Sequence, residues 1–275
     1  VFPAMGSHGG ATSQGQLEIL KHQGITEELL GVPVLSEIEP VEVGCTEDGL
    51  AVYVDRNALQ AKFIVAVNRI KKHTDFTGVL ESGILKMLSI GIGKQRGADA
   101  YHKQAQDYGF CHMISTVSSV VLQKCPVAFG LAILENGREE TTHLEAVSAA
   151  ALPDREPKLL EQAKALLPRL PFDELDILIV DWMGKNISGT GMDSNVLGRR
   201  MQTGEPELTT PRIKRVLVRD LTDDSEGNAT GIGFADFTRS RLVSKIDKMA
   251  LYQNLITGGG RKRVEFLHTM IRMMT

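Results

Sequence analysis

Three histidines lie in sequence surroundings that could support chemistry: His8, His73 and His102. His8 stands between glycines in the run from 6 to 10, where we expect few packing neighbours and therefore a role in a site. An imidazole exchanges protons near neutral pH and also binds nickel, copper, zinc or iron. The remaining histidines are expected to be structural or to lie on the surface: His22, His112, His143 and His268.

Basic side chains accompany these histidines. Arg69, Lys71, Lys72 and Lys94 could each bind a phosphate or carboxylate, although each could equally be a solvated surface charge. Lys86 adjoins a row of apolar residues at helical spacing. It is therefore either a site lysine or a lysine whose aliphatic stem lies along the core.

Short motifs narrow the chemistry only partly. The chain has no His-Glu-x-x-His or Cys-x-x-Cys pattern for zinc and no Gly-x-Ser-x-Gly pattern for a serine hydrolase. Gly-x-Gly fragments at Gly91 and Gly189 lack the rest of a dinucleotide or P-loop fingerprint. The residues by themselves predict an α/β enzyme whose His/Lys site could hold an anionic ligand.

Composition excludes several classes of protein. The chain has 275 residues and a formal net charge of −3, with no basic stripe to neutralise nucleic-acid phosphates. No apolar run approaches the roughly 18 residues of a membrane span, and we find no signal peptide. Three widely spaced cysteines indicate reduced thiols, and we therefore expect a cytoplasmic protein. From the charge and the apolar runs we expect neither nucleic-acid nor membrane partners. The sequence does not define the oligomeric state.

The elements that would position these residues follow an α/β order. The apolar run 63–67 predicts a buried strand, and the Asp-Gly pair ending at Gly49 predicts a hairpin before it. Helices are expected from Ser13, where Gln16 would complete a capping box, and after Thr77. The second of these would place four apolar residues on one face: Leu80, Ile84, Leu85 and Leu88.

The second half of the chain repeats the pattern of a strand that ends in a glycine-rich loop. Residues 177–180 predict a strand before the loop 184–195, and residues 195–201 predict a helix. Another glycine-rich loop lies at 231–236. Alternation of strands and helices is typical of α/β layers.

We therefore predict two α/β domains with mixed sheets flanked by helices. Residues 1–152 would form an N-terminal catalytic and cofactor domain, 153–173 a connector helix, and 174–275 a C-terminal α/β domain. The site is expected in the cleft between the domains. Both ends of the chain read as interrupted elements, so we expect a first segment and a C-terminal tail to be absent.

Four residues in order resemble a motif set of the nickel-dependent lactate racemase family. Gly-Ser-His at 6–8 resembles the early Gly-Thr/Ser-His turn of that family, and Lys-His at 72–73 stands where the family has Pro-His. Ser-Gly-Ile-Leu-Lys at 82–86 is similar to the Ser-Gly-Gly-x-Lys segment, and His102 follows at the family's interval. Asp-x-Asn at 193–195 resembles a later motif.

The resemblance implies a nickel-pincer nucleotide, a pyridinium derivative that carries nickel through sulfur and carbon. Lys86 would attach this cofactor through a thioamide, with Lys72 and Gly83 also at the cofactor. His102 would be the protein ligand to nickel. The cofactor carries the hydride chemistry in such an enzyme, and the protein orients and tunes it.

The resemblance also implies where the substrate binds. His8 and His73 would stand on opposite sides of a 2-hydroxy acid and exchange its hydroxyl proton during inversion. Asn195 and Arg199 would contact the substrate from the second half of the chain.

The implied function is that of an isomerase, a racemase or epimerase of a 2-hydroxy acid that uses proton-coupled hydride transfer. A larger or more acidic hydroxy acid, or a sugar acid, fits the motifs at least as well as lactate. Two alternatives stay open: a non-catalytic α/β module that binds an anionic or nucleotide-like ligand, and a metal-dependent hydrolase.

Overall fold

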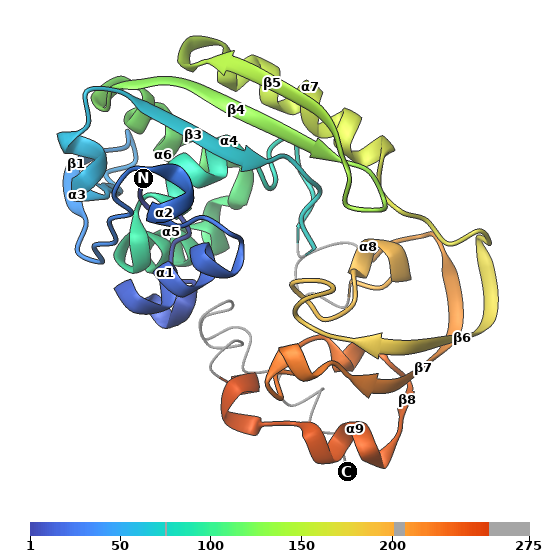
Figure 1. Ribbon diagram of the computed structural model, residues 1–275. Coiled ribbons are helices and arrows are strands. Elements are labelled where there is room, and N and C mark those ends of the chain that lie inside the picture. Colours follow the sequence, from blue (N-terminus) through green and yellow to red (C-terminus); the bar gives the residue numbers. More distant parts are fainter. Residues whose placement is uncertain (75, 201–206, 253–275) are drawn as a thin grey trace. The chain divides into compact units, whose positions relative to one another are not determined.

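The computed structural model describes residues 1–74, 76–200 and 207–252 (Figure 1). The chain divides into two compact units. Unit 1 comprises Val1–His73 and Thr77–Leu167, and unit 2 comprises Thr74–Phe76 and Pro168–Thr275. Within the described ranges, three sheets are accompanied by helices, which confirms the predicted α/β class.

Unit 1 combines a hairpin with a three-stranded sheet. The hairpin pairs β1 (Val41–Cys45) antiparallel with β2 (Ala51–Val54), as the Asp-Gly turn predicted. In the larger sheet, β3 (Ile64–Arg69) runs parallel to β4 (Val127–Glu135), and β4 pairs antiparallel with β5 (Thr141–Ser148). The helical segments of unit 1 are η1 (Gly9–Ala11), α1 (Ser13–His22), α2 (Glu27–Leu30), α3 (Arg56–Gln60), α4 (Ile84–Lys86), η2 (Met87–Gly91), α5 (Lys94–Tyr108), α6 (Phe110–Lys124), η3 (Ala149–Ala151) and α7 (Leu152–Ala165).

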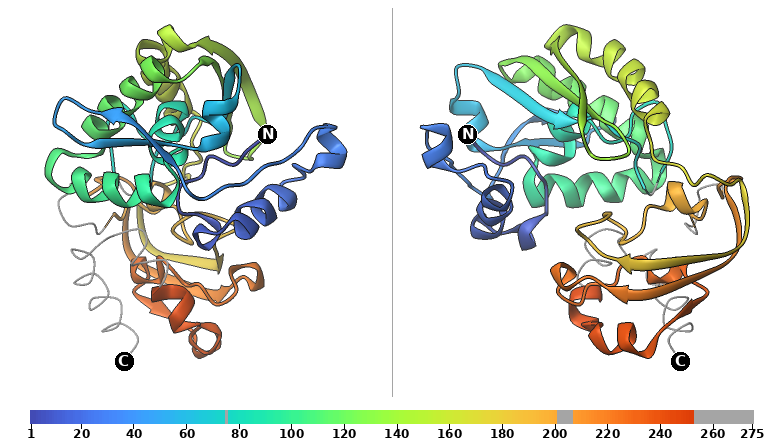
Figure 2. Two further views of the ribbon diagram at one scale, coloured as in Figure 1. Left: turned by 90° about the vertical axis from the view of Figure 1, so that its left-hand side faces the viewer. Right: turned by 45° about the vertical axis from the view of Figure 1, so that its right-hand side comes forward.

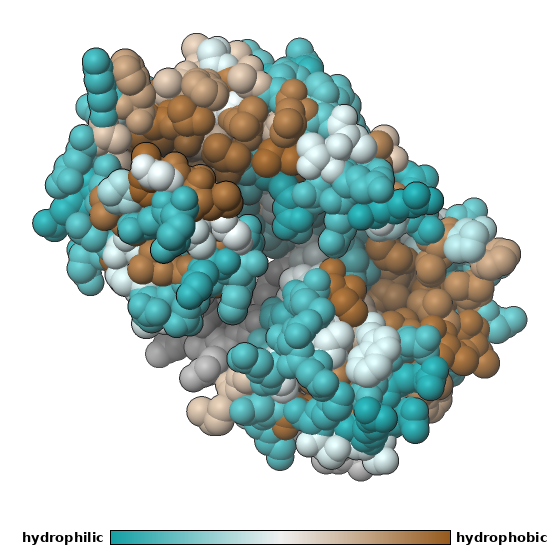
Figure 3. Space-filling model, viewed as in Figure 1, coloured by the Kyte–Doolittle hydropathy of each residue, from teal (hydrophilic) through white to brown (hydrophobic). Residues whose placement is uncertain are grey.

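Helices cover one face of the β3–β4–β5 sheet. α4 packs on β3 and β4, and α7 packs on β4 and β5 (Figures 1 and 2). On the other face, Val65 and Val67 are 44 % and 48 % exposed, and Leu144 of β5 is 59 % exposed. The run 63–67 was predicted to form a buried strand, and the structure buries Ile64 and Ala66 but leaves Val65 and Val67 exposed. Apolar side chains lie over this face in Figure 3.

The start of α4 differs from the prediction. The spacing of apolar residues predicted a helix from about Thr77, but the helix begins only at Ile84. Lys71 and Ser82 form a β-bridge, with backbone hydrogen bonds of 2.9 and 3.2 Å, so the chain before Gly83 is held as a loop. Leu80 is buried in that loop, and its burial explains why helical spacing was a misleading signal here.

The N-terminus of α1 corrects the predicted capping box. Thr12 is the N-cap, and its Oγ1 accepts the N–H of Gly15 at 3.0 Å. Gln16 is fully buried and its amide donates to the carbonyl of Gly6 instead. The residue that seemed to cap a helix thus organises the preceding turn.

The helix that we expected to connect two domains lies within unit 1. α7 packs against α4, β4 and β5, and the chain leaves unit 1 after Leu167. Pro153 occupies its first turn, where a missing N–H carries no penalty, and Pro157 lies inside the helix. The boundaries at 152 and 174 stay a prediction.

Unit 2 is built on a parallel sheet in the order β6-β7-β8. The packed face of the sheet includes Val216 and Val218. They belong to one buried core with Leu221, Phe234 and Leu242. The opposite face exposes Ile177 and Ile179, so the predicted buried strand is again covered on one side. The elements described are β6 (Glu174–Met183), α8 (Ser194–Leu197), β7 (Arg212–Leu221), η4 (Asp223–Ser225), η5 (Ile232–Phe234), β8 (Phe237–Thr238) and α9 (Ser240–Lys245).

The predicted helix 195–201 is shorter than expected. α8 ends at Leu197, because Gly198 adopts a left-handed conformation at φ 65°. A Cβ at Gly198 would lie 2.1 Å from the carbonyl oxygen of Pro211, so glycine is also required by the close backbone approach. Residue 201 lies outside the described part of the chain.

None of the helices in the described ranges has the length and apolar character needed to cross a membrane.

Candidate functional site

His8 lies in a tight turn that fixes the orientation of its ring. The residue is exposed and precedes η1, and its Nδ1 lies 2.5 Å from the carbonyl oxygen of Met5. A carbonyl oxygen only accepts hydrogen bonds, so Nδ1 carries the proton and Nε2 is the basic nitrogen of the neutral ring. Gly9, at φ 65°, has no space for a Cβ against the backbone of Gly15. The turn therefore requires glycine directly after the histidine.

Buried polar groups fasten this turn to the rest of unit 1. The Gln16 amide donates to the carbonyls of Gly6 at 2.8 Å and His8 at 3.3 Å. Lys94, at the start of α5, donates from Nζ to the Pro3 carbonyl at 2.6 Å and lies 2.7 Å from Asp55 Oδ2. Both side chains of that ion pair are fully buried. Lys94 is therefore a structural cation, so both roles expected for it, binding of a ligand anion and a solvated surface charge, are wrong.

His73 lies in a loop whose backbone is held by hydrogen bonds to Glu81. The buried Glu81 carboxylate accepts the backbone N–H of His73 at 2.6 Å and that of Gly78 at 3.2 Å. Lys164 of α7 approaches the same carboxylate at 3.1 Å. Lys72, the neighbour predicted at the cofactor, is half-buried. Sequence reasoning missed Glu81, because a carboxylate with distant partners leaves no local pattern.

Lys86 is the last residue of α4 and is half-buried. The following segment η2 is π-helical and leads through Ile92 and Gly93 into α5. Such π-helical turns are frequent at functional sites. The helical path from 84 to 108 therefore carries both Lys86 and His102.

The first turn of this path is held by Glu156 of α7. Its Oε2 accepts the N–H of Leu85 at 2.9 Å. Burial raises the pKa of Glu156 to about 7, although hydrogen bonds from the backbone of Leu85 and Ile84 act in the opposite direction. Gly83 packs directly against this carboxyl group. Glu156 was not predicted as part of the site, because its partner Leu85 lies 71 positions away in the sequence.

His102 has a ring orientation like that of His8. Its Nδ1 lies 2.6 Å from the carbonyl oxygen of Ala98, one turn earlier in α5, and its ring meets Phe110 edge-on at 5.6 Å. Nδ1 is again the donor, which leaves Nε2 as the nitrogen with a lone pair. Histidines that bind metals usually make this kind of bond with their second ring nitrogen.

The four residues predicted in the first half all belong to unit 1. Lys86 and His102 share one helical path, and the His8 turn is bonded to that path through the Gly6 N–H and the Gly91 carbonyl at 3.0 Å. His73 belongs to the loop that leads into Gly83. Backbone hydrogen bonds thus connect the His8 turn to the helical path, and the His73 loop leads into that path. The roles of the four residues stay predictions.

Asn195 and Arg199 belong to unit 2. The N–H of Asn195 donates to Asp193 Oδ1 at 2.7 Å, at the start of α8. Arg199 donates to the carbonyls of Phe234 at 2.6 Å and Ile213 at 2.9 Å, and it pairs with Asp236 at 2.8 Å. These contacts give Arg199 a structural task, and substrate binding by either residue stays a prediction.

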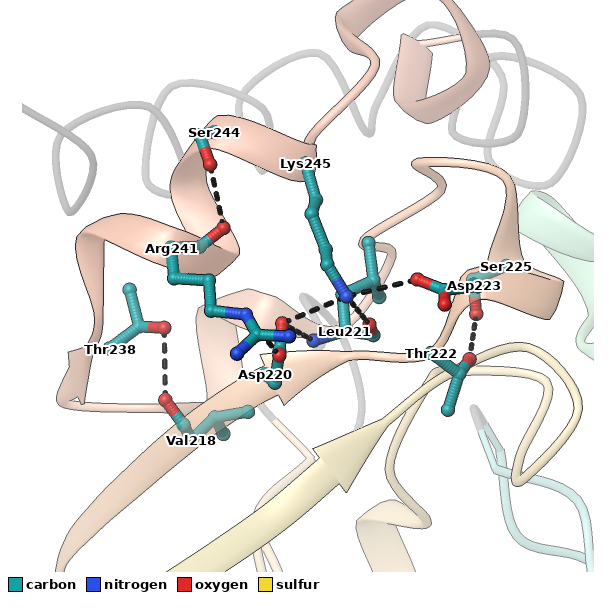
Figure 4. Close-up of polar contacts among 10 residues, drawn as sticks. All are labelled: Val218, Asp220, Leu221, Thr222, Asp223, Ser225, Thr238, Arg241, Ser244 and Lys245. Carbon is teal, nitrogen blue, oxygen red and sulfur yellow. Dashed lines mark hydrogen bonds and ion pairs between the residues drawn. The ribbon is translucent and has the colours of Figure 1, made fainter.

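A polar cluster at the end of β7 was not predicted (Figure 4). Asp220 pairs with Arg241 at 2.9 Å and Lys245 at 3.2 Å, and Lys245 also reaches Asp223 at 3.0 Å. Desolvation would raise the pKa of Asp220, but the Leu221 N–H and the two cations lower it overall. Because Arg241 and Lys245 both belong to α9, the cluster fixes that helix to the sheet.

The described ranges contain no group of three or more His, Cys, Asp or Glu side chains placed to hold a metal ion. A catalytic zinc site is usually built from three such ligands. A site of the predicted kind, in which one histidine binds a metal that a cofactor carries, would not need such a group of three side chains.

Comparison with known proteins shows a likeness in structure. No protein-family profile matches the chain, and no curated protein matches it. Among solved structures, it is similar to the lactate racemase apoprotein from Thermoanaerobacterium thermosaccharolyticum, with 15 % sequence identity and a TM-score of 0.49. The match covers 74 % of this chain and 49 % of that one, so the chain spans about half the length of the enzyme. A likeness at this level does not define a function.

Proposed function

We propose that this chain is a racemase or epimerase of a 2-hydroxy acid that uses a nickel-pincer nucleotide. The observation that carries the proposal is the shared ring geometry of His8 and His102. Each donates from Nδ1 to a backbone carbonyl, so each has Nε2 as its basic nitrogen. This is the state that a proton acceptor and a metal ligand need.

The residues of unit 1 fit the implied cofactor. Lys86 would attach it, His102 would ligate nickel through Nε2, and Lys72 and Gly83 would border it. The fit rests on the Nδ1 bond of His102 and on the half-buried position of Lys86 beside a π-helical turn. When bound, the cofactor would supply the hydride acceptor and donor for the substrate carbon.

The protein would supply the proton transfers. His8 would accept or return the hydroxyl proton at Nε2, and His73 would do the same on the opposite side of the substrate. An imidazole is suited to both tasks because its ordinary pKa lies near neutral pH. Inversion requires such groups on both faces, so loss of either histidine should stop it.

One observation favours a non-catalytic module that binds an anionic ligand. Arg199, predicted to contact substrate, is held by two backbone carbonyls and Asp236. A chain without that cation for a carboxylate could retain a cofactor and yet invert no hydroxy acid.

Inversion assays separate the two functions. Protein co-expressed with a nickel-pincer biosynthesis system is incubated with single enantiomers of a panel of 2-hydroxy acids, and products are resolved by chiral chromatography. We expect inversion by the parent, loss of it in His8→Ala and His73→Ala with nickel retained, and no loss in His22→Ala, whose side chain is exposed. Both variants inverting at the parent rate would refute their roles. Bound nickel without any inversion would support the binding module.

A further inference from the structure

A carboxyl group from α7 lies against the start of the helical path that carries Lys86. Glu156 is 2 % exposed, and its Oε2 accepts the Leu85 N–H at 2.9 Å. Carboxyl groups are seldom buried without a compensating partner, because desolvation is costly. A buried carboxyl group at this position therefore requires an explanation from its surroundings.

The explanation lies in the first turn of α4. The first N–H groups of a helix have no partner within the helix and need an outside acceptor. Gly83 is the N-cap and offers no side chain, so the acceptor comes from another element. Glu156 fills that role across 71 residues of sequence separation.

The lack of a side chain at Gly83 leaves room for this carboxyl group. A Cβ on Gly83 would lie 2.2 Å from Glu156 Oε1, well inside any real contact. The φ of Gly83 is −178°, an extended conformation that any residue adopts, so the requirement for glycine is one of space. The glycine predicted at the cofactor thus has a packing role toward α7.

The same helix holds the His73 loop. Lys164 of α7 contacts Glu81 at 3.1 Å and the Gly78 carbonyl at 3.3 Å. Glu81 in turn accepts the His73 N–H. One helix therefore contacts two of the chain segments that carry predicted site residues, the His73 loop and the start of α4.

We propose that Glu156 is a positioning residue for Lys86, holding the first turn of α4 so that the lysine is presented in one orientation. The consequence for cofactor attachment rests on the proposed function; the consequence for the lysine itself does not. Removing the carboxyl group would leave the N–H of Leu85 without this acceptor, and the first turn of α4 would fray.

The first test measures the reactivity of Lys86 without any cofactor. The purified full chain is reductively methylated with formaldehyde and borohydride, and the rate at Lys86 is followed by peptide mapping. We expect faster labelling of Lys86 in Glu156→Ala and a rate close to the parent in Glu156→Gln, because the glutamine carbonyl still accepts an N–H. The exposed Lys103 of α5 reports equal reagent in all samples.

Leu159→Ala is the matched control for general loss of stability. Leu159 is fully buried on the same helix, and truncation there opens a cavity without touching α4's amides. We expect this variant to lose stability as Glu156→Ala does, but to label Lys86 at the parent rate. Equal labelling of Lys86 in the parent and Glu156→Ala would overturn the proposal, and so would equal acceleration by Leu159→Ala.

The second test follows attachment of the cofactor during co-expression. The fraction carrying the nucleotide-sized mass increment should fall by about 10-fold or more in Glu156→Ala, as is usual when a group that orients a reactive residue is lost. Full loading of Glu156→Ala would overturn the positioning role. A parent that shows no increment would count against the proposed function alone, because the labelling test would still decide the role of Glu156.

Discussion

Lys164 Nζ lies 3.1 Å from Glu81 Oε1, and the other carboxylate oxygen of Glu81 accepts the N–H of His73 at 2.6 Å. The Glu81 side chain is fully buried, whereas Lys164 is 22 % exposed. The pair therefore connects α7 to the loop that carries His73. Removing the cation would leave a buried carboxylate without its counter-charge.

Lys164→Met tests this connection. We expect the free energy of unfolding to fall by about 1–3 kcal/mol, less than for a fully buried pair because Lys164 is partly solvated. Urea denaturation measures the loss, and amide hydrogen exchange at His73 should become faster. Lys158→Met, at an exposed position of α7, should change neither quantity. Unchanged exchange at His73 in Lys164→Met would show that the loop does not depend on the pair.

The buried ion pair of Lys94 and Asp55 should be more sensitive. Lys94→Met would leave the fully buried Asp55 carboxylate unpaired and would remove the donor to the Pro3 carbonyl. We expect a loss of about 3–5 kcal/mol in the free energy of unfolding. Lys103→Met, at an exposed site of the same helix, is the control. A melting temperature equal to the parent's in Lys94→Met would contradict the role assigned to this pair.

The raised pKa of Glu156 predicts how the free energy of unfolding depends on pH. Burial raises its pKa in the folded protein from 4.5 to about 7, against the hydrogen bonds from Leu85 and Ile84. The folded state therefore binds this proton more tightly than the unfolded state, and the stabilisation is complete below pH 4.5 and lost as the pH rises through about 7. The loss should reach at most about 3 kcal/mol.

Glu156→Gln isolates this effect, because glutamine has the shape of the protonated acid and does not ionise. The difference in unfolding free energy between variant and parent, measured by urea denaturation from acid to neutral pH, should shift in favour of the variant as the pH rises. A difference that stays constant across this range would mean that Glu156 does not titrate as described.

The contact between Gly83 and Glu156 predicts a measurable coupling. Gly83→Ala should destabilise the protein by about 1–3 kcal/mol through overpacking. The same substitution in a Glu156→Ala background should cost clearly less, because the atoms that its Cβ would meet are gone. A double-mutant cycle of unfolding free energies measures the difference. Additive costs would show that the two residues do not compete for one space, and Gly189→Ala, with open space around it, is the control.

Much of the fold was predictable because its signals are local. The hairpin of β1 and β2 follows from turn chemistry, and strand β3 follows from an apolar run. A run of apolar residues does not reveal whether both faces of a strand are covered, so the exposure of Val65 and Ile177 was not foreseen. The late start of α4 depends on a β-bridge that no helical pattern records.

The candidate site was predictable only in part, for a related reason. His8, His73, Lys86 and His102 stood out by their surroundings and by a family resemblance. The groups that hold them did not, because Glu156 acts on Leu85 over 71 positions and Lys164 on Gly78 over 86. A carboxylate whose partners are so distant looks like any surface charge in the sequence.

The central claim is that Lys86 carries a nickel-pincer nucleotide. The most direct measurement is the intact mass of the protein after co-expression with a nickel-pincer biosynthesis system, for the parent, Lys86→Ala and the exposed control Lys103→Ala. We predict a nucleotide-sized increment in the parent and in Lys103→Ala that is absent from Lys86→Ala. A parent of unmodified mass, from cells that load a known lactate racemase, would contradict covalent attachment at Lys86.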